Sequence, residues 1–231
     1  SYEPSPGLWI DNLLNFPVTF RSGVLDNVDS EEYGLGREQK SILPRTFLYL
    51  LESGTDDDQK EALGWLTKTM ERAIETIYDP VEGGFFRYAE TRDWRVPHYE
   101  KFSDLNAGSV LLLYRLNEIK PSPRLIEAAD STLRYLTSTL YDSDLGCFLN
   151  FQVADTNYYF LNEKRRKAVN PPKVMGKIFS DRLAATLNYL IEVNEYVNDA
   201  KLEEQVIRSL DFLEQMILQG QEIRRYFSAP E

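Results

Sequence analysis

Helical segments of two kinds alternate along this chain of 231 residues. Segments of the first kind are apolar most of the way round, and they are predicted at residues 42–52, 103–119 and 180–198. Such a helix must be covered on several sides. Segments of the second kind carry one apolar stripe and a charged back, as solvent-facing helices do, and they are predicted at residues 57–77, 123–140 and 200–218. The sequence therefore predicts an inner–outer helical hairpin that is used three times.

The connections between these segments differ in length in a regular way. A few residues join each inner segment to the outer one after it, whereas long loops at 78–102 and 141–179 lead back to the next inner segment. All long loops should then lie at one end of the array, where function usually resides. Such hairpins form either an α-solenoid or an α/α toroid. We expect residues 41–231 to be a single domain, complete or part of a longer chain, with residues 1–40 as an extended segment packing on it.

An internal repeat supports the hairpin arrangement. Residues 77–88 align without gaps on residues 140–151, and each copy directly follows an outer segment. In both copies a Tyr-Asp pair and a later glycine indicate a turn, and the alternating apolar residues after it indicate a short strand. The simplest interpretation is that the copies close the helical hairpins.

Charge and composition exclude several classes of partner. The chain has 26 Lys and Arg against 37 Asp and Glu, a formal charge of −11 at pH 7. We therefore expect no nucleic-acid binding and no polybasic membrane contact. Because the sequence contains no run of 18 apolar residues, it predicts no membrane span. The polar segment 1–7 has no signal-peptide core, so we expect a cytoplasmic location.

One cysteine and one histidine limit the chemistry further. Cys147 alone cannot form an intrachain disulfide or a four-cysteine zinc site, and His98 alone cannot build a His-rich zinc site. We expect no cofactor and no metal ion. A metal-dependent role would rest on scattered acids, which suit Mg²⁺ or Ca²⁺ rather than zinc.

The loop at residues 83–106 is the richest in groups that could carry chemistry. His98 and Glu100 lie just before an inner helix, at the mouth of the array. A histidine there can transfer protons near neutral pH, and Glu100 can act as an acid or base or orient a neighbour. The alternative is structural: His98 caps the inner helix, and Lys101 pairs with a surface acid.

The same loop carries an ordered motif. Its parts are Gly-Gly-Phe-Phe-Arg-Tyr at 83–88, Trp94, Pro-His-Tyr-Glu-Lys at 97–101 and Asn-Ala at 106–107. This motif resembles the toroid portion of the thioredoxin-domain-containing, spermatogenesis-associated-protein-20-type family, which is similar to N-acylglucosamine 2-epimerases and six-hairpin glycosidases. Residues 152–156 resemble a second motif of that family, and residues 179–181 a third.

The resemblance implies an all-α fold of α/α helical hairpins. About six hairpins close such a ring and three are visible here, so we expect a partial (half) α/α toroid of the six-hairpin glycosidase-like type, with short β-hairpins in the long loops. The implied function is binding or processing of a carbohydrate, as in the epimerases and glycosidases, at a loop-rich concave site around His98.

This interpretation assigns roles to individual residues. His98 is the expected proton-transfer residue, with Glu100 or Asp155 as its partner. The expected substrate-binding residues are Arg87, Tyr88, Trp94, Tyr99 and Asn106. Arg87 would bind an anionic or hydroxyl group, and Trp94 with Tyr88 would form a stacking wall, since aromatic faces pack on sugar rings. Glycoside hydrolysis would instead need two carboxylates about 5 to 9.5 Å apart, and the candidates are Glu100, Asp104, Asp155 and Asp181.

A second interpretation comes from a different functional class. Leu105, Val153 and Leu183 stand where the family that the chain resembles has polar residues. Those substitutions favour a catalytically degenerate module whose concave face binds a protein partner, binds a second copy or completes a larger assembly. The two interpretations predict a sugar or polyol ligand in one case and self-association or a protein partner in the other.

Overall fold

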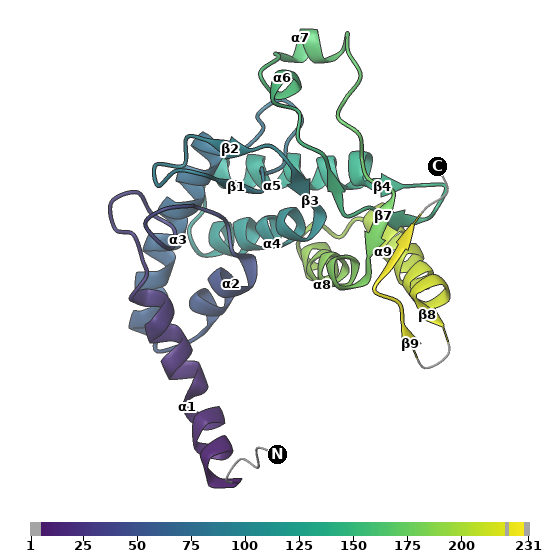
Figure 1. Ribbon diagram of the computed structural model, residues 1–231. Coiled ribbons are helices and arrows are strands. Elements are labelled where there is room, and N and C mark those ends of the chain that lie inside the picture. Colours follow the sequence, from purple (N-terminus) through teal and green to yellow (C-terminus); the bar gives the residue numbers. More distant parts are fainter. Residues whose placement is uncertain (1–5, 220–221, 229–231) are drawn as a thin grey trace.

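The computed structural model describes residues 6–219 and 222–228, and helices dominate it (Figure 1). The longer helices are α1 (Pro6–Leu25), α2 (Pro44–Glu52), α3 (Asp56–Thr76), α4 (Ser103–Ile119), α5 (Pro123–Tyr135), α8 (Ser180–Val197) and α9 (Ala200–Phe212). Two short helices, α6 (Thr156–Tyr159) and α7 (Glu163–Arg166), lie in the loop before α8. The π-helical turns η1 (Leu136–Leu140) and η2 (Leu213–Ile217) continue α5 and α9.

Short antiparallel strand pairs tie the loops together. They are β1 (Tyr88–Ala89) with β2 (Pro97–His98), β3 (Lys101–Phe102) with β6 (Phe151–Gln152), β4 (Tyr141–Asp142) with β5 (Cys147–Phe148), β7 (Lys177–Phe179) with β10 (Tyr226–Ser228), and β8 (Leu218–Gln219) with β9 (Glu222–Ile223). Strands β3 and β7 each run directly into an inner helix. Their pairing therefore fixes where α4 and α8 begin.

The two predicted kinds of helix are both present. Inner helix α4 lies at the centre and contacts α2, α3, α5 and α8, and its apolar run 110–113 is buried. Outer helix α3 buries one stripe that includes Leu66, Met70 and Ala73. It begins at a capping box in which Thr55 and Asp58 satisfy each other's backbone N–H groups. The outer segments 123–140 and 200–218 are helical over most of their predicted length and end in the two π turns.

The internal repeat corresponds to one repeated turn. Tyr78 pairs with Phe85 in the first copy, and Tyr141 pairs with Phe148 at the same positions of the second. The carboxylates of Asp79 and Asp142 each accept a hydrogen bond from the backbone N–H two residues later. The turn and short strand predicted at residues 77–88 and 140–151 are therefore confirmed.

A third copy of this turn follows α1 and was not predicted from the sequence. Val28 pairs with Leu35, and the Asp29 carboxylate accepts a hydrogen bond from the Glu31 N–H. Tyr33 has a positive φ of 61° where the first copy has Gly83 at 81°. A non-glycine residue in that conformation hides the turn from sequence reasoning, because glycine is the usual signal. The shared spacing Asp-x4-Gly, present at Asp29 and Asp79, was the remaining clue.

The copy of this turn after α1 and the copy after α3 are each held by a buried lysine that precedes an inner helix. The Lys101 ammonium lies 2.7 Å from an Asp79 carboxylate oxygen and donates to the Gly83 carbonyl. Lys40 makes the same kind of contact with Asp29, at 2.9 Å. Both lysine–aspartate pairs are buried. The prediction that Lys101 pairs with a surface acid is therefore wrong, because its partner is an acid of the repeated turn.

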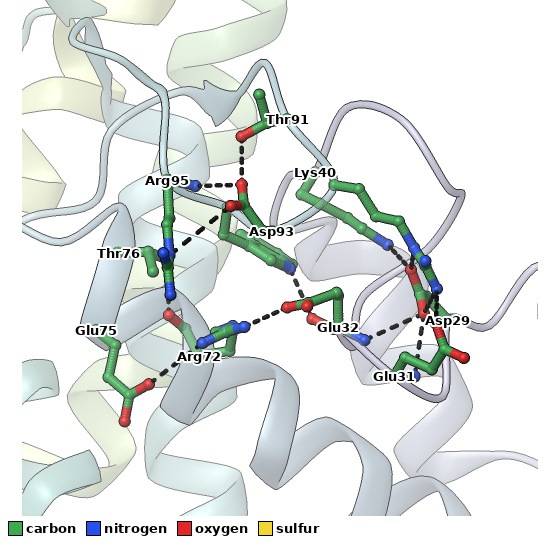
Figure 2. Close-up of polar contacts among 12 residues, drawn as sticks. Asp29, Glu31, Glu32, Lys40, Arg72, Glu75, Thr76, Thr91, Asp93 and Arg95 are labelled. Carbon is green, nitrogen blue, oxygen red and sulfur yellow. Dashed lines mark hydrogen bonds and ion pairs between the residues drawn. The ribbon is translucent and has the colours of Figure 1, made fainter.

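An arginine completes each buried pair. Arg166 reaches Asp79 at 2.7 Å, and Arg92 reaches Asp29 through two hydrogen bonds. The guanidinium of Arg92 and the ammonium of Lys40 hold the pKa of Asp29 well below its usual value. Figure 2 shows Lys40 directed at Asp29, with further polar contacts running through Glu32 and Arg72 to α3. These contacts join the N-terminal turn to the rest of the molecule.

The N-terminal segment departs from the prediction. Residues 6–25 form helix α1 rather than an extended segment, and Figure 1 shows it projecting away from the helical body. Two prolines obscured it, although Pro6 suits the first turn of a helix. Arg21 anchors its end through carbonyls of Leu50, Ser53 and Asp58. The division into residues 1–40 and 41–231 stays a prediction.

Replacing Lys101 with methionine tests the buried pair. Lys101→Met leaves Asp79 with only part of its compensating charge, and breaking a buried ion pair costs about 3–5 kcal/mol of unfolding free energy. The matched control is Lys167→Met, because Lys167 pairs with Glu163 on the surface. Urea denaturation should show a large loss for the first variant and little change for the second. Equal midpoints for both variants would contradict a clamping role for Lys101.

Candidate functional site

A cavity of about 800 Å³ opens where the three inner helices begin. Its wall includes the first turn of α2 (44–46), residues 104–105 of α4 and residues 181–182 of α8. Long loops lead into α4 and α8, so this is the loop-rich end of the array, where the sequence analysis expected a site. Tyr88 of β1, Phe102 of β3 and Arg87, which directly precedes β1, also line the wall.

Aromatic and charged side chains pack against one another in part of the wall of this cavity. The Arg182 guanidinium lies 3.0 Å from each carboxylate oxygen of Asp104, and it also lies over the Phe102 ring, 4.5 Å from the centroid. Arg87 lies over the same ring at 5.2 Å. Phe102 therefore supports two guanidinium groups at the cavity wall, which holds their positions by cation–π attraction.

His98 is positioned by strand pairing and by a carboxylate. Tyr88 and His98 are register partners in β1 and β2, and their rings stack with centroids 4.8 Å apart and planes 12° from parallel. Nδ1 of His98 is hydrogen-bonded to the Glu100 carboxylate. Glu100 also lies 3.8 Å from Arg87. A neutral imidazole that donates Nδ1–H to a carboxylate leaves Nε2 free to accept a proton.

A second, smaller cavity lies on the His98 side of this stack. Its volume is about 420 Å³, and its wall includes His98, Tyr99 and Phe160. Tyr88 lines the larger cavity and His98 lines the smaller one. The stacked Tyr88–His98 pair thus forms part of the boundary between the two. The His98 side chain is 35% exposed and that of Glu100 is 20% exposed, so solutes can reach the pair.

Five of the eight predicted site residues lie together. Arg87, Tyr88, His98 and Glu100 contact one another as described, and Tyr99 adjoins them at the smaller cavity. The Tyr99 ring packs on Phe86 and Tyr159 with centroids 4.8 and 5.7 Å away, and burial raises the pKa of its hydroxyl. This cluster is the part of the predicted site that the structure brings together.

Trp94 does not form a stacking wall, so that prediction is corrected. Its side chain is fully buried, and its Nε1–H donates to the Glu32 carbonyl at 2.9 Å. The loop at residues 29–36 covers the ring so closely that a Cβ on Gly34 would lie 2.5 Å from it. Trp94 fills the core beneath that loop and cannot touch a ligand.

Asn106 and Asp155 also have structural roles. The buried Asn106 amide accepts a hydrogen bond from the Phe85 N–H and donates to the carbonyls of Phe85 and Phe102, so it fixes the repeated turn against α4. Asp155 is exposed and caps α6 by accepting from the Tyr158 N–H. The hydrogen bond from His98 goes to Glu100, so of the two predicted partners the structure selects Glu100.

Sequence reasoning did not assign several residues that line the larger cavity. Arg45 and Tyr189 come from α2 and α8, and Arg182 from the first turn of α8. Asp104 and Asp181 were considered only as members of a carboxylate pair. A signal was available: each of Arg45, Asp104, Asp181 and Arg182 lies in the first turn of an inner helix, and these turns end the long loops.

Two absences concern only the part of the chain that the structure describes. Within residues 6–219 and 222–228, no three or more His, Cys, Asp or Glu side chains gather in a way that could hold a metal ion. In the same residues, no helix is both long enough and apolar enough to cross a membrane.

The different surroundings of Trp94 and Tyr88 lead to a prediction. Trp94→Ala should lower the free energy of unfolding by about 3–5 kcal/mol, as large-to-small changes of buried aromatic residues do. Tyr88→Ala, at a cavity wall, should cost much less. Urea denaturation of both variants measures the difference. If the Trp94 variant unfolded at the wild-type urea concentration, the placement of Trp94 in the core would be wrong.

Comparison with known proteins confirms the fold. No family model matches the chain. Spermatogenesis-associated protein 20 from Mus musculus is 28% identical over 169 residues, which are 66% of this chain and 21% of that protein. This chain therefore spans about a fifth of the length of the curated relative that it matches.

Solved structures of sugar-active enzymes share the architecture. Cellobiose 2-epimerase from Spirochaeta thermophila superimposes with a TM-score of 0.68 at 17% identity, over 94% of this chain and 59% of that one. A D-mannose isomerase gives 0.65 at 10% identity, over 99% and 57%. The chain thus covers less than two thirds of each. Its fold is a partial α/α toroid of the six-hairpin glycosidase-like type, and its resemblance to the spermatogenesis-associated-protein-20-type family is confirmed.

Proposed function

We propose that this chain is a carbohydrate-processing toroid domain in which His98 moves a proton on a bound sugar. The observation that carries the proposal is the His98–Glu100 pair. His98 lines the smaller cavity and stacks on Tyr88, which lines the larger cavity where the inner helices begin. Glu100 fixes the imidazole with Nε2 free, which is the arrangement that a general base needs. The neighbours in fold include sugar epimerases and a sugar isomerase, which supports a sugar as the ligand class.

The surroundings of His98 fit this role. The Tyr88 ring limits rotation of the imidazole by stacking on it. Arg87 lies beside Glu100 and adds guanidinium donors at the cavity wall, which suits a hydroxyl or anionic group of the ligand. The Tyr99 ring lines the smaller cavity with His98 and offers an apolar surface on which a sugar ring can pack. Asp155, Trp94 and Asn106 have no part in this version of the site.

A single histidine bears on the type of reaction. Epimerisation removes a proton from one face of a carbon and returns it to the other, so it needs a second acid. Isomerisation between an aldose and a ketose moves a proton between neighbouring carbons, and one base can do this. His98 is the only histidine in the chain. In an epimerisation a carboxylate or a tyrosine would have to be the second acid. Because Glu100 is occupied in holding His98, this arrangement best supports a transfer between C1 and C2 by one base.

Solvent exchange tests this proposal. In deuterium oxide, the wild type should introduce deuterium at C2 of at least one aldose in a panel of simple sugars, as followed by proton NMR. His98→Ala should reduce the rate about 100-fold or more, since a positioned general base contributes about 10²–10⁴-fold. Glu100→Gln should reduce it less, because the imidazole stays in place but loses its fixed tautomer.

The exposed Glu163→Gln variant serves as the control and should exchange at the wild-type rate. Wild-type exchange that persists in His98→Ala would show that His98 is not the base. A well-folded wild type that exchanges no sugar in the panel would count against the whole catalytic proposal.

The second candidate is a non-catalytic interaction module. The observation that favours it is the surface of α1, where Phe16 and Val18 are 61% and 72% exposed. Both side chains add exposed apolar area to a helix that projects from the helical body, and a protein partner would cover it. In this version, α1 contacts a protein partner or a second copy, and the cavity has no catalytic role.

Analytical ultracentrifugation distinguishes the self-association form of this candidate. The wild type should form dimers or larger species at micromolar concentration, and the double variant Phe16→Ser/Val18→Ser should be monomeric. Leu43→Ser, at an exposed position outside α1, is the control. Wild type that stays monomeric at all concentrations would exclude the second-copy form.

A further inference from the structure

The larger cavity gathers positive charge in a chain that carries a formal charge of −11. Three guanidinium groups line it, those of Arg45, Arg87 and Arg182. The carboxylates that line it are those of Asp104 and Asp181. The wall therefore carries one net positive charge, opposite in sign to the molecule as a whole.

The three arginines differ in how far their charge is already compensated. Arg182 forms a close pair with Asp104 at 3.0 Å, and Arg87 lies 3.8 Å from Glu100. Arg45 hydrogen-bonds to the hydroxyl of Tyr189, whose pKa is raised by burial, so this partner is neutral. Among the described residues, Arg45 forms no ion pair. It is exposed at the cavity, and most of its five N–H donors remain for a ligand.

The ends of the inner helices add to this field. Helices α2, α4 and α8 all start at the cavity, and in none of them does the side chain of the N-cap residue accept a hydrogen bond from the first turn. Outer helix α5 also lacks such a cap, whereas α3 and α9 are capped by Thr55 and Asp199. The start of a helix carries a partial positive charge of about half a unit. Asp104 and Asp181 lie in the first turns of α4 and α8 and offset that charge, whereas the first turn of α2 contains Arg45 and no acidic residue. Arg45 thus lies in a field of its own sign, which an anion would relieve.

We propose that the ligand of the larger cavity is a sugar that carries one anionic group, a carboxylate or a phosphate, and that Arg45 binds this group. The inference rests on the proposed carbohydrate function and narrows its substrate class. A guanidinium can bind either group through two parallel hydrogen bonds. The sugar hydroxyls then remain for Asp181 and Tyr88, which line the same cavity. A neutral sugar would leave the charge of Arg45 uncompensated.

Isothermal titration calorimetry with four probes tests this proposal. The probes are D-glucuronate, D-glucose 6-phosphate, D-glucose and inorganic phosphate. One or both charged sugars should bind the wild type at least about tenfold more tightly than glucose, because a charge-assisted hydrogen bond contributes about 1.5–3 kcal/mol. Comparison of glucuronate with glucose 6-phosphate tells which anionic group is preferred. Raising the salt concentration should weaken only the charged sugars.

Variants show whether Arg45 is responsible. Arg45→Ala should bring the affinity for the preferred charged sugar down to that for glucose, and Arg45→Lys should give an intermediate value, since lysine keeps the charge without the paired donors. Arg165→Ala, which removes an exposed arginine of α7, is the control and should bind like the wild type. Circular dichroism of each variant confirms that the fold is kept.

The other outcomes separate the inference from the function on which it rests. Equal binding of glucose and the charged sugars would overturn the anionic preference and leave the carbohydrate proposal standing. Inorganic phosphate that binds as tightly as glucose 6-phosphate would overturn the proposal that the ligand is a sugar. Binding of none of the four probes would overturn both. A preference for charged sugars that survives Arg45→Ala would overturn the role of Arg45.

Discussion

The buried contact between Lys101 and Asp79 supports most of what is built around it. Burying two charges costs several kcal/mol each, and only close pairing with further hydrogen bonds offsets that cost. Here Arg166 and the Gly83 carbonyl supply those bonds. The contact joins the turn after α3 to the strand that leads into α4. Lys40 and Asp29 repeat it one hairpin earlier, so the same clamp sets the spacing of two successive inner helices.

This clamp also bears on the candidate site. Lys101 directly follows Glu100, and the Arg87 N–H donates to the Glu100 carbonyl at 2.8 Å. The segment that carries the imidazole and its carboxylate is thus held on one side by a buried ion pair and on the other by strand pairing. A rigid support of this kind is what a proton-transfer pair requires, because a small misplacement costs much of the rate. The structural residue Lys101 therefore directly follows the candidate site residues of segment 98–100.

Local patterns predicted the helices well and the site only in part. The period of apolar residues located α4 at its observed bounds, since burial on all sides leaves an unmistakable apolar run. His98, Glu100, Arg87, Tyr88 and Tyr99 were found because they crowd into one loop. Trp94, Asn106 and Asp155 belong to the same motifs but serve the core, a turn and a helix cap. A motif shows which residues recur together, and it does not show which of them face solvent.

The sequence by itself determined the inner and outer helices, the long loops at one end and the excess of acidic residues, because these depend on local periodicity and composition. Only the tertiary structure decided which polar and aromatic side chains are accessible to a ligand and which of them lie together. Trp94 is hidden because the loop at 29–36, about 60 residues away in sequence, folds over it. Arg45 and Arg182 share a cavity because packing of α2 and α8 on α4 brings their first turns together. Burial and convergence are properties of distant contacts, and no local pattern encodes them.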